Sequence, residues 1–109
     1  MTLQEAHKLV LRKWRDIRDG KGWDRSGSNC AFCQKFEHEG CPACPICQAT
    51  GESECKDTPY WDFRDADDAF VVRDKRGCYT CCAVGGPESY AAACEMVKFL
   101  ENLPIPEEP

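Results

Sequence analysis

The chain of 109 residues contains no long apolar run. The longest apolar stretch in its N-terminal segment is Leu9-Val10-Leu11, whereas a membrane-spanning helix needs about 18 or more apolar residues. A secretory signal would need an uncharged apolar core of roughly 7–15 residues. These absences predict a cytoplasmic protein in a reducing compartment, where structural disulfides are rare.

The chain also lacks the common catalytic motifs. It has no Gly-rich phosphate loop, no G-x-S-x-G and no H-E-x-x-H, and its two histidines leave little material for a His-based triad. The acidic residues Asp62, Asp65, Asp67 and Asp68 do not follow the spacing of a calcium loop, so a solvated acidic turn is the preferred interpretation. The sequence predicts no enzyme.

Cysteine, by contrast, is abundant, with 10 residues in the chain. Such a content is typical of either a disulfide scaffold or a metal-bound module. Because no export signal is visible, metal binding is the preferred interpretation.

Two amphipathic helices are predicted at the ends of the chain. In residues 2–19 the apolar side chains recur on one face at 100° per residue, and Thr2 and Glu5 fit a capping box. A second helix over 87–103 begins near Pro87, with Tyr90, Cys94, Val97 and Leu100 as its apolar stripe. Residues 69–84 resemble a short β-hairpin.

Residues 30–55 show neither helical nor strand periodicity. Six cysteines lie there among Gly and Pro, with too few apolar side chains to hold the segment by packing. We therefore predict a single domain, 1–109, of small α+β class. In this prediction the two terminal helices frame a loop-rich, metal-stabilised zinc-knuckle centre.

The cysteine spacings favour a structural zinc site. A C-x2-C pair converges on one ion because both thiolates sit on one tight turn, and two such pairs, Cys30/Cys33 and Cys41/Cys44, lie within fifteen residues. Because a tetrahedral site takes four ligands, the candidate set is Cys30 and Cys33 with two of Cys41, Cys44 and Cys55. A second site built from Cys47, Cys78 and Cys81 is the weaker part of this prediction, and His38 is an alternative ligand.

Two other thiol chemistries remain open. Cys41-x2-Cys44-x2-Cys47 also matches three ligands of an iron–sulfur cluster. Cys30-x2-Cys33 could cycle between dithiol and disulfide, although it follows a Gly/Ser loop rather than a strand.

Charge divides the chain unevenly. The whole chain carries 14 Lys+Arg against 19 Asp+Glu, a formal net charge of −5, which argues against a protein wrapped in basic surface. Residues 1–25 are nevertheless basic, and Lys8, Arg12 and Arg15 share one helix face. A protein partner is the preferred prediction, and salt-sensitive nucleic-acid binding through that face is the alternative.

Parts of the sequence resemble a family of small Cys-rich proteins of bacteriophages and bacteria. The similarity covers residues 13–60 and 91–104, on a helix with Trp, then N-C-x2-C, C-x2-C-P, a further Cys with T-P-Y, and a short E-x3-F-L helix. It marks Cys30, Cys33, Cys41, Cys44 and Cys55, with Thr58-Pro59-Tyr60. It implies metal binding in a bacterial or phage-infected cytoplasm, and one hypothesis is a phage-encoded modulator of a host factor.

Overall fold

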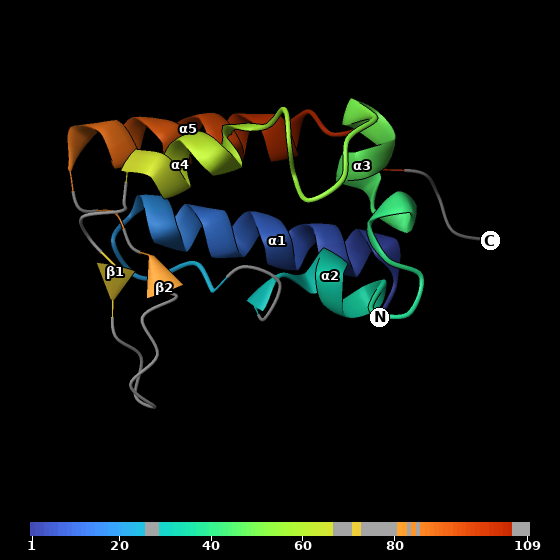
Figure 1. Cartoon of the computed structure of the whole chain (residues 1–109). Helices are drawn as coiled ribbons and strands as arrows, with labels where there is room; N and C mark the ends of the chain where they lie inside the picture. Colours follow the sequence, from blue (N-terminus) through green and yellow to red (C-terminus); the bar gives the residue numbers. More distant parts are fainter. Residues whose placement is uncertain (26–28, 67–70, 73–80, 83, 85, 106–109) are drawn as a thin grey trace.

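Helices form most of the structure, a computed structural model that describes residues 1–25, 29–66, 71–72, 81–82, 84 and 86–105. The elements follow one another along the chain (Figure 1) as α1 (Leu3–Arg18), α2 (Ala31–Lys35), the 3₁₀ turn η2 (Cys41–Ala43), α3 (Pro45–Thr50), α4 (Pro59–Ala66), β1 (Val71–Val72), β2 (Cys81–Cys82) and α5 (Pro87–Glu101). The two long helices, α1 and α5, lie one above the other (Figure 1), with α4 beside α5 and α2 near the start of α1.

The predicted α+β class is wrong, because the described fold is helical. Its described β-structure consists of two antiparallel residue pairs, Val71 with Cys82 and Val72 with Cys81. The rest of the hairpin predicted over 69–84 lies outside the described residues, apart from Val84. Four such residues do not make a second structural layer.

The predicted loop-rich zinc-knuckle centre is also wrong. Residues 30–55 contain α2, η2 and α3, and α4 follows shortly after. Each short helix buries one or two apolar side chains, such as Phe32, Ile46 and Phe63, in a core shared with α1 and α5. Helices of five to eight residues complete too few turns for their periodicity to show in the sequence.

Helix α1 confirms the N-terminal prediction. Thr2 Oγ1 accepts the Glu5 amide at 3.1 Å and Glu5 Oε2 accepts the Thr2 amide at 3.3 Å, so the capping box forms as the sequence indicates. The predicted face is buried, except that His7 is only half-buried. His7 Nε2 donates a hydrogen bond to the Leu100 carbonyl at 2.7 Å, which ties α1 to the end of α5.

Helix α5 also forms, but its buried face differs from the predicted stripe. Tyr90 is half exposed, and the buried residues include Ala92, Ala93 and Met96. Two consecutive alanines add little bulk, which allows α5 to lie close to both α1 and α4. A pattern judged from large side chains alone therefore misplaces the apolar face.

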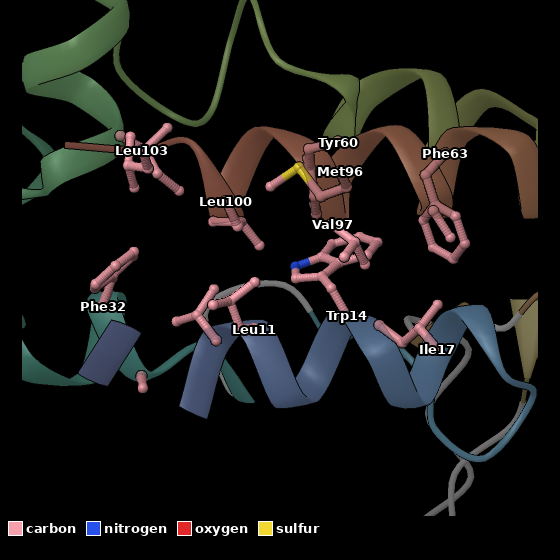
Figure 2. Packing of buried hydrophobic residues seen from close by; sticks show 14 of the residues in the cluster. Leu11, Trp14, Ile17, Phe32, Tyr60, Phe63, Met96, Val97, Leu100 and Leu103 are labelled. Carbon is pink, nitrogen blue, oxygen red and sulfur yellow. The ribbon is translucent and has the colours of Figure 1, made fainter. Parts of the chain in front are cut away.

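Aromatic side chains fill the layer between α1 and the α4/α5 pair. Figure 2 shows Trp14 and Ile17 pointing from α1 towards α4 and α5. The Trp14 ring meets Phe63 edge to face at 5.1 Å and Tyr60 at 5.9 Å between centroids, a geometry that adds to the stability gained by burial. Among the described helices, none combines the length and apolar character that crossing a membrane requires.

A candidate thiol site between α2, α3 and the Cys55 loop

Cys30 directly precedes α2, and Cys33 lies in the first turn of this helix. Cys30 is the residue that precedes the helix, and its carbonyl accepts the Gln34 amide at 3.0 Å. Ala31 and Phe32 are buried in the core, which fixes the helix and leaves Cys33 exposed on its outer side. Both cysteines are thiols rather than halves of disulfides.

The Cys33 thiol donates a hydrogen bond to the sulfur of Cys30. The Cys33 thiol lowers the pKa of Cys30 to about 6, against the desolvation of the sulfur, and the Lys13 ammonium and the amides of Cys33 and Phe32 lower it further. The same hydrogen bond raises the pKa of Cys33, as do the partial desolvation of its sulfur and the nearby sulfurs of Cys30, Cys55 and Cys44. Of the pair, Cys30 is therefore the thiol that ionises at the lower pH, and Cys33 keeps its proton to higher pH.

Cys33 thus lies within electrostatic reach of Cys30, Cys44 and Cys55, which come from three segments. Cys44 is the residue before α3, and its carbonyl accepts the Gln48 amide at 3.0 Å. Cys30, Cys44 and Cys55 are all partly buried against the hydrophobic core. Cys47 lies one turn into α3 and is half-buried.

The loop that presents Cys55 has a strained backbone. Glu54, Cys55 and Asp57 have φ angles of 59°, 58° and 64°, in the left-handed region that non-glycine residues rarely occupy. Each such residue costs on the order of 1–3 kcal/mol, and such strain concentrates at functional sites. The loop keeps this conformation through two anchors: Trp61 Nε1 donates to the Glu54 carbonyl at 2.9 Å, and Thr58 Oγ1 donates to the Cys55 carbonyl at 2.6 Å.

The Thr58-Pro59-Tyr60 segment connects this loop to the core. Thr58 Oγ1 also accepts the Tyr60 amide at 3.2 Å and so caps α4, in which Pro59 is the first residue. The Tyr60 hydroxyl donates to Asp24 Oδ2 at 2.9 Å. One threonine therefore fixes both the start of α4 and the carbonyl of Cys55.

Two cavities adjoin the thiols. A cavity of about 310 Å³ is lined by Cys30, Cys33 and Cys55 together with Trp14 and Trp61. A second one, of about 280 Å³, is lined by Cys33, Cys44, Cys47 and Cys55. Cys33 and Cys55 border both cavities, as do Ile46 and Glu54.

The structure describes only part of the predicted ligand set. Cys33 and Cys55 line both cavities, Cys30 lines one of them, and Cys44 and Cys47 line the other, whereas His38 is exposed. The side chains of Cys41 and Cys81 and the whole of Cys78 lie outside the described residues, so the second predicted site stays a prediction. No group of three or more His, Cys, Asp or Glu side chains in the described part of the chain is already spaced to hold a metal ion.

Asp24 is a residue of this region that sequence reasoning missed. Its carboxylate is completely buried and receives Lys13 Nζ at 2.8 Å, Tyr60 Oη at 2.9 Å and Arg64 Nη1 at 3.1 Å. Its position in a Gly- and Ser-rich turn resembles a solvated loop, and nothing in the sequence signals its burial.

Comparison with known proteins identifies no relative of this chain: no family model matches it, and no curated protein or solved structure is found to be similar.

Proposed function

We propose that this chain is a zinc-stabilised module that binds a protein partner. The observation that supports the proposal is that Cys30, Cys33, Cys44 and Cys55 line two cavities that share Cys33 and Cys55. Sulfur donors are the ligands that structural zinc prefers, and four of them complete a tetrahedral site. Cys41 and Cys47 are the alternative members of the set.

The donor set fits a metal in its chemistry. Zinc binds thiolates, and the pKa of Cys30 is already lowered to about 6, first through its hydrogen bond from Cys33. The strained loop at Cys55 also fits this role, since metal binding releases free energy that offsets such a backbone conformation. The ion would cross-link α2, α3 and the Cys55 loop, whose short helices bury few side chains.

Elemental analysis tests the metal. We expect protein purified without added metal to contain close to one zinc ion per chain and no iron. Cys30→Ser, Cys33→Ser, Cys44→Ser and Cys55→Ser should each lose most of the zinc, while Cys94→Ser on α5 keeps it. A brown, iron-containing preparation would show an iron–sulfur cluster instead, and zinc loss from Cys94→Ser alone would contradict the proposed set.

An exposed aromatic beside the thiols supports the protein partner. Trp61 lies at the cavity of about 310 Å³, is 42% exposed, and packs edge to face on Tyr60 at 5.1 Å. An exposed, well-anchored tryptophan at the mouth of an apolar hollow has the properties of an interface hot spot.

Site-specific photo-crosslinking tests this surface. A photoreactive residue at position 61 should give one defined adduct in bacterial cells, and Cys55→Ser should abolish it. The matched control is position 9, where Leu9 is exposed on α1. Equal adduct patterns from positions 61 and 9 would contradict a partner site at Trp61.

Nucleic-acid binding is the second candidate, because Lys8, Arg12 and Arg15 are all exposed on α1. If that face binds phosphates, affinity for a DNA or RNA probe should fall steeply with added salt. Replacement of the three residues by Gln should then abolish binding, and absence of binding at low salt would exclude this candidate.

A further inference from the structure

A basic pocket lies beside the C-terminal part of α1. Its volume is about 430 Å³, and it is lined by three cations, Lys13, Lys21 and Arg25, against one carboxylate, Asp16, with Trp23 at its side. The chain as a whole is acidic, with a net charge of −5. The pocket is therefore positively charged, although the chain as a whole is negatively charged.

Local hydrogen bonds build the walls of this pocket. After α1 the chain turns back at Gly20, whose φ is +75°, and the Lys21 amide donates to the Asp16 carbonyl at 2.8 Å. Asn29 holds the opposite wall, since its Oδ1 accepts the Arg25 amide at 3.0 Å and its Nδ2 donates to the Trp23 carbonyl at 2.9 Å.

The charges of the pocket are not balanced within it. Lys13 is paired with Asp24, but Asp24 also binds Arg64, so this buried carboxylate already faces two cations. Lys21 and Arg25 then share the pocket with Asp16. An anion entering the pocket would meet a surplus of positive charge.

Arg25 provides a second, independent observation. Its Nε is buried and has no hydrogen-bond partner among the residues that the structure describes, although buried donors in proteins are nearly always satisfied. The guanidinium lies 5.6 Å from the centroid of the Trp23 ring, which is 41% exposed. Because this Nε is enclosed, an oxyanion in the pocket would meet the rest of the guanidinium, which lies against the Trp23 ring and is suited to charge-assisted recognition of an oxyanion.

We propose that this pocket binds the phosphate group of a small phosphorylated ligand. Arg25 would donate from its guanidinium edge, Lys21 would add charge, and the exposed part of Trp23 would offer a stacking surface for a base. Free phosphate and a mononucleotide share this chemistry, and the volume of the pocket lies within the range of small-molecule sites. The inference does not depend on the zinc site.

Nuclear magnetic resonance of the full-length protein tests this site. Sodium phosphate and adenosine monophosphate are titrated separately at constant ionic strength, with sodium chloride and adenosine as references. We expect both phosphates to shift the Arg25 Nε–H signal, and a nucleotide ligand also to shift the Trp23 indole signal and bind more tightly. Shifts equal to those with chloride would overturn the proposal.

Three variants separate recognition from general charge. Arg25→Gln should weaken phosphate binding at least about tenfold, because charge-assisted hydrogen bonds are lost. Arg25→Lys keeps the charge without the planar guanidinium and should also bind more weakly. Lys98→Gln, on the exposed surface of α5, should bind as the wild type does. Wild-type affinity in a folded Arg25→Gln protein would overturn the proposal.

Discussion

At the scale of single residues, Asp24 is the buried charge on which two helices depend. It accepts from Lys13 on α1 and from Tyr60 and Arg64 on α4. A carboxylate removed from water is tolerated only when it is paired and hydrogen-bonded, and removal of the partner leaves the other charges buried alone.

Asp24→Ala should therefore lower the free energy of unfolding by about 3–5 kcal/mol, because Lys13 and Arg64 lose their counter-charge. Tyr60→Phe removes a single hydrogen bond to the same carboxylate and should cost about 1 kcal/mol. Glu95→Gln, in an exposed pair with Lys98, should change the free energy of unfolding by less than about 1 kcal/mol. Urea denaturation measures all three, and a loss in Asp24→Ala no larger than in Glu95→Gln would refute the buried network.

Of the two thiols Cys30 and Cys33, we expect Cys30 to react at the lower pH. Its pKa is lowered to about 6, mainly by the hydrogen bond from Cys33, whose own pKa is raised. In metal-free protein, alkylation of Cys30 should therefore increase with pH around a midpoint near 6 and reach its plateau by neutral pH. Cys33 should react only at higher pH, as followed by mass spectrometry of peptides. The reverse order of reactivity would contradict this assignment.

At the scale of elements, the sequence predicts the long helices well. The apolar face of α1 repeats over several turns and its cap residues are visible in the sequence. The limits of α5 are set by Pro87 and by the residues before Pro104. The short helices α2, α3 and α4 could not be predicted, because tertiary packing of one or two side chains stabilises each of them.

Burial of the α1/α5 interface is tested by two leucines of equal size. Leu100 is fully buried, whereas Leu9 is 50% exposed on α1. Leu100→Ala should lower the free energy of unfolding by about 2–5 kcal/mol, and Leu9→Ala should change it by about 0.5 kcal/mol or less. Equal losses in thermal or urea denaturation would contradict this packing.

Thr58 connects the start of α4 to the Cys55 loop. We therefore predict that it positions Cys55 for zinc without being a zinc ligand itself. Thr58→Ala removes the cap of α4 and the bond to the Cys55 carbonyl, so it should destabilise the protein by about 0.5–2 kcal/mol and weaken zinc binding. Thr58→Ser keeps the hydroxyl and should restore both properties. Competition with a chromophoric chelator measures the zinc affinity, and wild-type affinity in Thr58→Ala would contradict a positioning role.

At the scale of the whole molecule, spacing alone predicts a cysteine site but says nothing of its surroundings. The pairs at 30/33 and 41/44 predict a shared site from local turn geometry, and Cys55 is included for its proximity in sequence, a choice with which the resemblance agrees. The strain at Glu54, Cys55 and Asp57, the network at Asp24 and the pocket at Arg25 depend on contacts between distant segments. Such contacts leave no periodic signal in a single sequence.

Cobalt titration of the metal-free protein tests the central claim most directly, because cobalt(II) replaces zinc and reports its ligands in visible light. We predict saturation at one equivalent, with intense thiolate-to-cobalt absorption and the bands of a tetrahedral ion. Cys44→Ser should weaken this absorption and Cys47→Ser should leave it unchanged, which separates two cysteines three residues apart. A titration without thiolate-to-cobalt absorption would contradict the account.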